Sequence, residues 1–573
     1  MSRAFRPVYG FRPATLAAPL AMPDQRFDQA FKDKAAPAAG PSRRHGRLAR
    51  FCVLTLPLPI AIGFGWATAH VLAANQLTIA EGVLAVLSGF AVFWMAMSVV
   101  SSFFGLFWTP APRAHATTPG LRVAILLPMY GEDAEATMTP AVQLLQELRG
   151  PGHGHRFSLH IVSDTRSGKA ALAEAQMVAK ITAERPDLAI TYRHREKNTD
   201  YKQGNIRDWI MRNGGAYDAA LILDADSVMG RSTVLQMADA LVQDPTCALI
   251  QSPCNVGPGS TIWQRLQSFA SRVYGGPHMR GFAVWTGSEG NFMGHNAIVR
   301  IKAFAACCGL PHLSGPRPLG GVVLSHDFVE AGLLRRAGWG VRIMPEAIES
   351  QEDAPESLLG YIKRDARWCQ GNLQHMRLVT KPGFHPITRL HFFSGAIAYL
   401  GSAILLTILT LWATAGRDAG GEGLASLQAW LMGAVLVMLF APRVFGVIDY
   451  IRRAGLPKGR RLSFVKMLAL ETVIAVLTAP VMMLHHCKII FKTLTGVDTG
   501  WPQHSHGRIP LKVLAKFHAA ETLIGASLLA AIAFGVLSPW LLPVALGLVL
   551  AVPVSAYVSG DAGKLPIMPM PKL

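Results

Sequence analysis

Long apolar segments lie towards both ends of the chain and enclose a segment of mixed character. Residues 48–74 and 79–108 each exceed the ~20 apolar residues that a membrane-spanning helix needs. Further apolar runs follow the mixed segment, at residues 391–415, 424–448, 464–485, 517–537 and 540–559. The pattern predicts a polytopic α-helical membrane domain into which another domain is inserted.

The inserted segment, residues 119–380, alternates between two kinds of pattern. Helical patterns occur, for example, at residues 135–149 and 168–184. Short β-rich runs lie at residues 121–128, 157–164, 189–194, 218–226 and 247–252. This βαβ alternation predicts an α/β domain built on a parallel sheet that is covered on both faces. Ligands of such sheets lie beyond the carboxyl ends of the strands.

Basic residues beside the apolar runs predict the orientation in the membrane. Arg43, Arg44, Arg47 and Arg50 lie at the start of the first run, so the positive-inside rule places the N-terminus in the cytosol. Two crossings return the chain to that side, which makes the α/β domain cytosolic. Residues 1–47 are rich in Pro, Ala and Arg and are expected to form a mostly disordered cytosolic tail, although the pattern at 23–34 allows a short helix.

The run at 464–485 differs from the other apolar runs. The segments on either side of it, 449–463 and 486–516, are both basic and both favour the cytosol. The run itself contains Glu471 and Pro480. We therefore expect an interfacial or re-entrant helix at this position, which leaves six crossings, two before the α/β domain and four after it.

The composition agrees with a membrane protein. Of 573 residues, 51% are hydrophobic and 16% are charged, whereas about 25% are charged in soluble proteins. The formal net charge is +19, and its location indicates membrane topology and a cytosolic face, not a nucleic-acid surface. The seven cysteines form no C-x-x-C pair, which disfavours zinc and predicts free thiols.

Two carboxylates follow the strand predicted at 218–226. Residues two apart on a strand share a face, so Asp224 and Asp226 can address one ion. Carboxylate oxygens suit Mg²⁺ or Mn²⁺, which bind through one or two carboxylates together with substrate phosphates. The alternative is an ordinary turn, where such pairs are common.

Other polar residues follow the first two strands or begin a helix. Asp164 ends the strand at 157–164, where a helix N-cap is the alternative. Pro128, Tyr130 and Glu132 end the first strand and suit a base and ribose, although an ordinary βα loop has the same composition. Lys202, in "YKQGN", stands at a predicted helix start that attracts anions, and a solvated helix cap is equally consistent with it.

Two later motifs carry further candidates. Asp327, in "SHDFVEA", is a candidate general base for an acceptor hydroxyl, while the alternative is an N-cap that forms a capping box with Glu330. Arg364, Arg367 and Trp368 lie in "KRDARWCQGN". Arginine binds diphosphates and tryptophan packs against sugars, and the alternative is an amphipathic surface helix with one buried tryptophan.

The order of these motifs resembles the processive family-2 glycosyltransferases, which include cellulose synthase and hyaluronan synthase, over about residues 119–520. The strings "SHDFVEA", "RRAGW" and "RDARWCQGN" are most similar to the glucans biosynthesis glucosyltransferase H family. That resemblance implies a bacterial inner-membrane enzyme that makes osmoregulated periplasmic glucans from UDP-glucose. It implies a GT-A-like catalytic domain with Mg²⁺ or Mn²⁺, a lipid bilayer around the helices, and an acidic protein partner such as acyl carrier protein.

The resemblance also implies roles for individual residues. Asp164 and Tyr130 are expected to contact the uridine, Asp224 to support the nucleotide, and Asp226 to hold the metal-bound diphosphate. Asp327 matches the catalytic base, although Ser-His-Asp stands where Thr-Glu-Asp is usual.

Two more segments match the family. Arg367 and Trp368 match the last two letters of its Q-x-x-R-W motif, whose Gln is replaced by Arg364. Residues 464–516 are similar to the interfacial helix and gating loop of cellulose synthases, and Thr495, Asp498 and Trp501 are expected to contact the donor when that loop closes.

Two alternatives stay open at this point. The chain is also compatible with a synthase of another polysaccharide, cellulose-like or hyaluronan-like. A non-enzymatic transporter with a nucleotide-sensing domain is disfavoured, because a sensor does not need a base such as Asp327.

Overall fold

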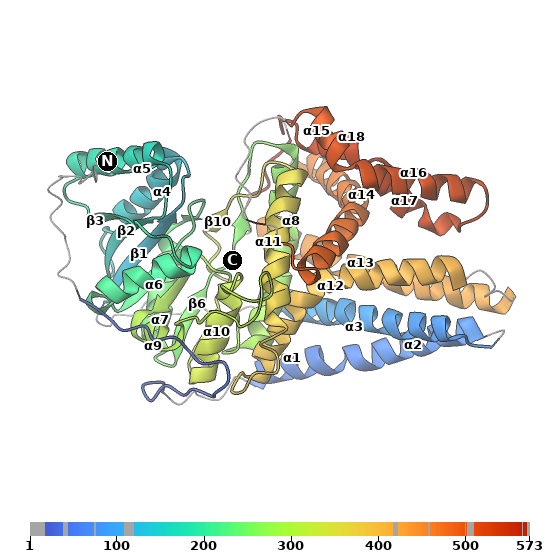
Figure 1. Ribbon diagram of the computed structural model, residues 1–573, viewed down its shortest axis with the longest axis horizontal. Coiled ribbons are helices and arrows are strands. Elements are labelled where there is room, and N and C mark those ends of the chain that lie inside the picture. The colour runs from blue at the N-terminus through green and yellow to red at the C-terminus, as the bar shows by residue number, and fades with distance from the viewer. Residues whose placement is uncertain are drawn as a thin grey trace.

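The α/β domain and the long apolar helices lie at opposite ends of the molecule (Figure 1). The computed structural model describes residues 18–37, 44–73, 76–107, 120–415, 422–456, 459–498, 500, 509–563 and 565–569. A seven-stranded sheet with helices on both faces forms one end, and long helices extend from it at the other. Both predicted parts, the α/β domain and the helical membrane domain, are present.

The strands of the main sheet are ordered β3-β2-β1-β4-β8-β6-β9. Their bounds are β1 Arg122–Met129, β2 Arg156–Ser163, β3 Ile190–His194, β4 Ala219–Ile222, β6 Cys247–Gln251, β8 Ala297–Arg300 and β9 Gly340–Ile343. Neighbours are parallel except at β8, which runs antiparallel to β4 and β6. The prediction of a parallel sheet is therefore wrong at β8. A strand of four residues carries no sequence signal of its direction, because the direction depends on how the strand pairs with its two neighbours.

Alternation along β1 divides the core of the domain in two. Val123, Ile125 and Leu127 are buried in the cluster on one face of the sheet, and Ala124 and Leu126 in the cluster on the other. Successive side chains of a strand point to opposite faces. A strand buried on both faces therefore needs a continuous apolar run, which β1 has.

Helices cover both faces of this sheet. Their bounds are α4 Ala134–Glu147, α5 Gly168–Glu184, α6 Tyr201–Asn213, α7 Arg231–Gln243, α9 Ile301–Cys307 and α10 His326–Ala337. Asp133 caps α4 by accepting a hydrogen bond from the amide of Ala136 (2.8 Å), as the preference for Asp at helix N-caps predicts. The helices predicted at 135–149 and 168–184 are confirmed as α4 and α5.

A small sheet and two long helices connect the domain to the apolar helices. The small sheet pairs β5 Val228–Met229, β10 Ser350–Glu352 and β7 Asn255–Val256. The long helices are α8 Ile262–Thr286 and α11 Leu358–His375. Arg280 of α8 forms a buried ion pair with Asp449 (2.5 Å) and donates a hydrogen bond to the carbonyl of Gly105 (2.9 Å). These contacts fix α8 to two of the apolar helices.

Five helical segments are long and apolar enough to cross a membrane, by length and composition, among the described residues. They are the segment formed by α1 Arg44–Thr55 and α2 Pro57–Leu72, then α3 Ile79–Phe107, α12 Pro386–Ala415, α13 Glu422–Ala454 and α14 Arg461–Leu494. Two bent pairs raise the number to as many as seven. These are α15 Leu511–Phe517 with α16 Ala519–Ala533, bent by 66°, and Pro539–Val549, which comprises η3 and α17, with α18 Ala551–Val558, bent by 53°.

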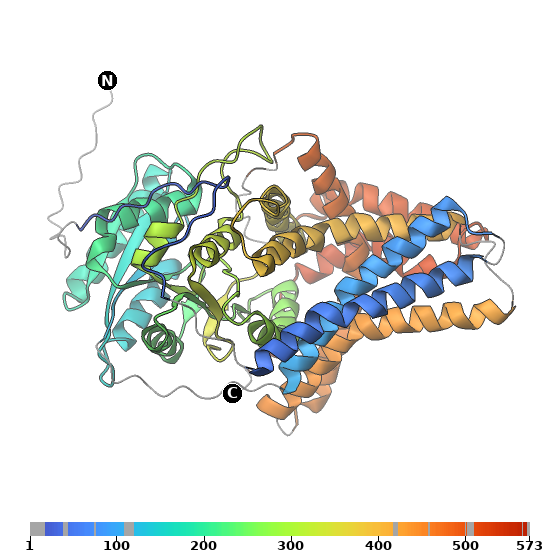
Figure 2. The same ribbon diagram turned by 90° about the horizontal axis from the view of Figure 1, so that it is seen from below.

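Part of the N-terminal tail is ordered against the α/β domain (Figure 2). Met22 is buried, the amide of Gln25 donates to the carbonyl of Gly309 (2.8 Å), and the indole of Trp339 donates to Asp33 (2.9 Å). The prediction of disorder is thus wrong for residues 18–37, and no helix forms at 23–34. Composition could not reveal this, because a few apolar side chains dock on a core that other segments build. Residues 1–17 lie outside the described part.

Both ends of α14 contact helices that adjoin the α/β domain. Near its start, Phe464 stacks on Tyr450 (ring centroids 5.7 Å apart) and contacts Phe269 of α8 (5.6 Å). Beyond its end, the carboxylate of Asp498 lies 3.4 Å from Arg367 of α11. In Figure 1, α14 runs across the direction of α2, α3 and α13. This arrangement favours the predicted interfacial placement, although α14 is also long enough to cross.

Reporter fusions test this placement. A reporter fused after Arg417 is expected in the periplasm, and reporters fused after Arg460 and Gln503 are expected in the cytosol, because α14 is expected to enter and leave on one side. Paired alkaline phosphatase and fluorescent-protein fusions at the three positions measure the sides. A periplasmic location at Gln503 would mean that α14 crosses, and the six-crossing arrangement would be wrong.

Candidate active site

The two aspartates after β4 lie in a turn and not in extended strand. The strand ends at Ile222, and the turn is closed by Ser227, whose hydroxyl accepts a hydrogen bond from the amide of Asp224 (2.8 Å). The turn that was the alternative interpretation is therefore present. It still holds both carboxylates, half-buried, at the carboxyl edge of the sheet.

The two carboxylates have opposite electrostatic surroundings. Burial opposes the charge on Asp224, but the positive charges of Lys202 and His295 outweigh burial and lower its pKa. Burial and the negative charges of Asp224 and Glu352 raise the pKa of Asp226 to about 6. Asp224 is thus neutralised by protein groups, while the charge of Asp226 is offset only in part, by His295 and Arg364. The donor set is of the kind that holds a hard divalent cation.

Lys202 connects this turn to the glycine-rich loop before β8. Its ammonium donates to the carboxylate of Asp224 and to the carbonyl of Gly294 (2.8 Å). Two other residues of "YKQGN" have structural roles. Gly204 leaves room for the backbone, because a Cβ there would lie 2.1 Å from the carbonyl oxygen of Thr199, and the side chain of Asn205 donates a hydrogen bond to the carbonyl of Val162 (2.9 Å). The motif therefore anchors α6 against β2 and directs Lys202 at the turn.

Asp327 lies on the other side of the same loop. A Cβ on Gly294, which has φ +88°, would lie 3.6 Å from the Oδ2 atom of Asp327. Asp327 is in the first turn of α10, next to His326, whose Nδ1 lies 3.0 Å from the carboxylate of Glu330. Burial opposes charge on His326, but Glu330 outweighs it and raises the pKa of His326. Since Glu330 pairs with His326, it forms no capping box with Asp327.

The residues expected to bind the uridine differ in exposure. Tyr130 is exposed at the edge of the sheet, and the guanidinium of Arg166 lies 5.9 Å from its ring. Glu132 accepts a hydrogen bond from the amide of Tyr130, and Pro128 lies half-buried within β1. These three are accessible from the carboxyl edge.

Asp164, by contrast, is buried. Both of its carboxylate oxygens accept hydrogen bonds from Arg195, at 2.8 and 2.6 Å. It ends β2 as predicted and is not a helix N-cap, since Ser167 caps α5. Contact with a uridine stays a prediction, and in this structure Asp164 fixes the position of Arg195.

The exposure of the motif residues on α11 differs from the amphipathic-helix alternative, which expects a buried tryptophan. Trp368 is 41% exposed and the guanidinium of Arg364 stacks over it (4.7 Å), whereas Arg367 is buried. Arg367 lies over the ring of Tyr201 (5.2 Å) and beside Asp498. The exposed tryptophan is available to a ligand.

The segment after α14 reaches this helix. Gln370 of α11 donates to the carbonyl of Val497 (3.2 Å), next to the contact between Arg367 and Asp498. Thr495 is the C-cap residue of α14, and its hydroxyl donates to the carbonyl of Phe491 (2.9 Å). Trp501 lies outside the described residues.

Sequence reasoning missed two residues beside the aspartates. His295 is buried, its Nε2 lies 3.2 Å from the carboxylate of Glu352, and its Nδ1 lies 3.9 Å from the thiol of Cys254. Although burial opposes its charge, Cys254 and Asp224 raise the pKa of His295 well above its ordinary value. The sequence around His295, "SEGNFMGHNAIVR", is glycine-rich, but no pattern in it indicates that His295 pairs with Glu352.

A cavity of about 490 Å³ lies on the membrane side of α11. Its lining combines aliphatic residues with aromatic and polar ones, and the latter include Trp263, Tyr361, Asp365, Tyr399, Arg443, Glu471 and His486. His486 joins two helices there, with Nε2 at 2.7 Å from Asp365 and Nδ1 at 2.8 Å from the hydroxyl of Ser402. Aromatic faces next to hydrogen-bonding groups suit a sugar chain.

Three comparisons relate the chain to known proteins. The model of glycosyl transferase family group 2 matches residues 220–445. A mannosyltransferase from Pyrobaculum calidifontis, PcManGT, in complex with GDP-Man and Mn²⁺, has a TM-score of 0.45 and 17% identity, over 73% of this chain and 99% of that one.

Two relatives named glucans biosynthesis glucosyltransferase H cover much more of the chain at higher identity. The one from Rhodopseudomonas palustris (strain BisA53) is 36% identical over 580 residues, which is 96% of this chain and 81% of the relative. The one from Shewanella sp. (strain ANA-3) is 38% identical over 492 residues, or 81% and 68%. The α/β domain is thus the catalytic part of a multi-pass membrane glycosyltransferase, and the chain belongs to the glucans biosynthesis glucosyltransferase H family.

Proposed function

We propose that this enzyme transfers glucose from UDP-glucose, with inversion, to a growing glucan chain, and passes that chain across the bacterial inner membrane to the periplasm. The observation that carries the proposal is the continuous path from Asp224 through Lys202 and Gly294 to Asp327. Asp224 and Asp327 lie on two sides of one glycine-rich loop, which supports a phosphate-binding edge beside a candidate base.

The donor side rests on the turn after β4. Lys202 places a positive charge where a diphosphate would lie, and Tyr130 lies exposed at the edge for a base. The unbalanced charge on Asp226 fits a divalent cation, Mg²⁺ or Mn²⁺, held by Asp226 with Asp224 nearby. Such an ion supplies neutralisation of the negative charge on the departing diphosphate.

The acceptor side rests on Asp327. Its carboxylate takes the proton of an acceptor hydroxyl while that oxygen bonds to C1 of glucose from the face opposite the diphosphate. The C1–O bond to UDP breaks, and its electron pair leaves with UDP. The pair formed by His326 and Glu330 holds the first turn of α10, so the carboxylate is positioned before the acceptor arrives.

Helix α11 connects the proposed site of glucose transfer with the proposed route of the glucan across the membrane. Trp368 is exposed beside Arg364, and Asp365 and Tyr361 of the same helix line the cavity among the membrane helices. A product that leaves the Trp368 face therefore has aromatic and polar surfaces to follow. The contact between Arg367 and Asp498 brings the segment after α14 to this point, as expected of a gating loop.

Family membership bears on two of the earlier alternatives, the transporter and the hyaluronan-like synthase. It makes the chain an enzyme, so a non-enzymatic transporter no longer fits, and the relatives' names point to glucan and not to hyaluronan. The cytosolic orientation of the catalytic domain and an acidic partner such as acyl carrier protein stay predictions.

Donor specificity is the first test. Membranes that contain the protein should incorporate ¹⁴C-glucose from UDP-[¹⁴C]glucose into polymer when Mg²⁺ or Mn²⁺ is present, because the site combines a diphosphate edge with a divalent-cation turn. GDP-mannose and UDP-N-acetylglucosamine should give no polymer, and membranes without the protein are the control. Polymer formed only from another sugar nucleotide would overturn the donor assignment.

Replacing the candidate base separates binding from chemistry. Asp327→Asn should lower transfer about 10²–10⁴-fold, the usual effect of losing a general base, while UDP-glucose affinity stays near that of the unaltered enzyme. Calorimetry and polymer assays measure the two quantities, and Asp187→Asn, at an exposed carboxylate that pairs with Arg185, is the control. A parallel loss of affinity would make Asp327 a nucleotide ligand.

The segment after α14 can be tested by deletion. Removing residues 495–501 should reduce polymer formation far more than UDP binding, because closure over the donor excludes water without contributing most of the binding. In the unaltered enzyme, UDP with Mg²⁺ should also slow proteolysis within this segment. Unchanged polymer synthesis after the deletion would mean that the segment is only a linker and has no gating role.

A further inference from the structure

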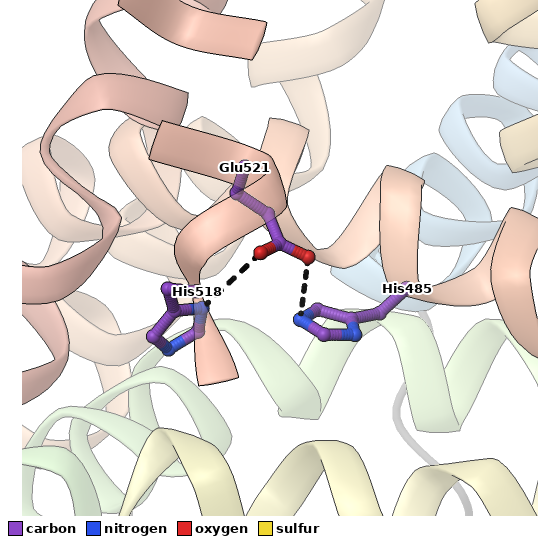
Figure 3. A group of neighbouring side chains, drawn as sticks. All are labelled: His485, His518 and Glu521. Atoms are coloured by element: carbon purple, nitrogen blue, oxygen red, sulfur yellow. Dashed lines mark ion pairs between the residues drawn. The ribbon is translucent and has the colours of Figure 1, made fainter. Parts of the chain in front are cut away.

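Three ionisable side chains meet between the C-terminal helices, away from the proposed active site. His485 belongs to α14, His518 lies at the bend between α15 and α16, and Glu521 is in the first turn of α16. Figure 3 shows an imidazole nitrogen of each histidine directed at the carboxylate. His485 Nε2 lies 3.2 Å from one oxygen of Glu521, and His518 Nδ1 lies 4.0 Å from the other.

All three side chains are buried, and their polar atoms are poorly satisfied. The exposed fractions are 3% for His485, 0% for His518 and 4% for Glu521. Within the part of the chain that the structure describes, hydrogen-bond partners are lacking for His485 Nε2, for both ring nitrogens of His518 and for one oxygen of Glu521. Buried polar atoms rarely stay unpaired, so several such atoms that converge on one point indicate a ligand that they share.

We propose that these three residues bind a zinc ion. Two imidazole nitrogens and one carboxylate oxygen form a known zinc ligand set, and the three ligand atoms here lie within 4.8 Å of one another. Ligands of tetrahedral zinc lie roughly 3.3 Å apart, given Zn–N and Zn–O distances of about 2.0–2.1 Å. The 3.2 Å separation between His485 and Glu521 already matches. Because all three ligand atoms lie within 4.8 Å of one another, His518 needs to approach by at most about 1.5 Å. Water would complete the coordination.

The chemistry of the ligands separates this site from the one after β4. Imidazole nitrogen suits zinc and other transition metals, whereas Mg²⁺ prefers the all-oxygen carboxylate ligands of Asp224 and Asp226. The cysteine spacing disfavoured zinc in the sequence, but cysteines have no part in this cluster. The two sites should therefore bind different metals.

The position of the cluster suggests what the ion does. His485 precedes the gating-type segment that follows α14, and His518 comes after it, at the 66° bend between α15 and α16. A zinc ion bound by both would join α14 to that bend and close the base of the intervening segment. Closing a loop at its base lowers the conformational freedom of the loop, so the ion would restrict the segment that reaches Arg367.

Metal analysis of the purified full-length protein tests the proposal. After expression with zinc and exchange into zinc-free buffer with Mg²⁺, the protein should retain about one zinc ion per chain by mass spectrometry. His518→Ala and Glu521→Ala should each retain less than about a tenth of that amount.

Two control variants should keep the zinc. His486→Ala alters the neighbouring histidine of α14, which bonds Asp365 and Ser402 instead. Asp226→Asn alters the other metal site and should lose Mg²⁺- or Mn²⁺-dependent transfer without losing zinc. If zinc were lost in Asp226→Asn and kept in His518→Ala, the ion would belong to the turn after β4 and the proposal would be wrong.

One measurement needs no variant, in case the altered proteins do not fold. Protein prepared with Co²⁺ in place of zinc should show the strong visible absorption of tetrahedral Co²⁺ with nitrogen and oxygen ligands, which octahedral Co²⁺ at an all-oxygen site does not give. Unaltered protein with less than about a tenth of a zinc ion per chain, and no such absorption with Co²⁺, would overturn the proposal.

Discussion

The catalytic end of this molecule depends on one electrostatic constraint, the repulsion between Asp224 and Asp226 in the turn after β4. Two nearby carboxylates that are partly buried do not both stay ionised unless positive charge compensates them. Lys202 and His295 compensate Asp224, while burial and the neighbouring carboxylates raise the pKa of Asp226 to about 6. This charge balance favours a cation beside Asp226. The same Lys202 that compensates Asp224 also holds the loop of Gly294 against Asp327.

A second constraint joins the soluble and membrane parts. The buried ion pair between Arg280 and Asp449, together with the bond from Arg280 to the carbonyl of Gly105, fixes α8 to α13 and α3. Removing one partner of such a pair costs about 3–5 kcal/mol, because the other charge stays buried. Helix α11 presents Trp368 to one side and Asp365 to the cavity. Under the proposed function, fixing the catalytic domain in this way would keep the site of transfer aligned with the route of the product.

Much of the architecture follows from local pattern. Apolar runs identify membrane helices because each helix must bury its backbone polar groups within itself. The continuous apolar run of β1 identifies a strand buried on both faces, and the edge of a sheet collects the residues that follow its strands. These two rules placed Asp224, Asp226 and Asp164 at one edge. The order of the motifs then indicated that Lys202, Asp327 and the arginines of α11 belong to the same site.

What the sequence by itself determined is therefore the set of elements, the edge where the site lies and the family of the chain. Only the tertiary structure decided that β8 is antiparallel, that residues 18–37 dock on the α/β domain, and that Trp368 is exposed while Arg367 is buried. It also decided the pairing of His295 with Glu352 and the meeting of His485 with His518 and Glu521. Periodicity reports whether a residue faces a core, but not which distant segment supplies that core. Contacts between side chains far apart in the sequence depend on how the elements pack, and no local pattern encodes that.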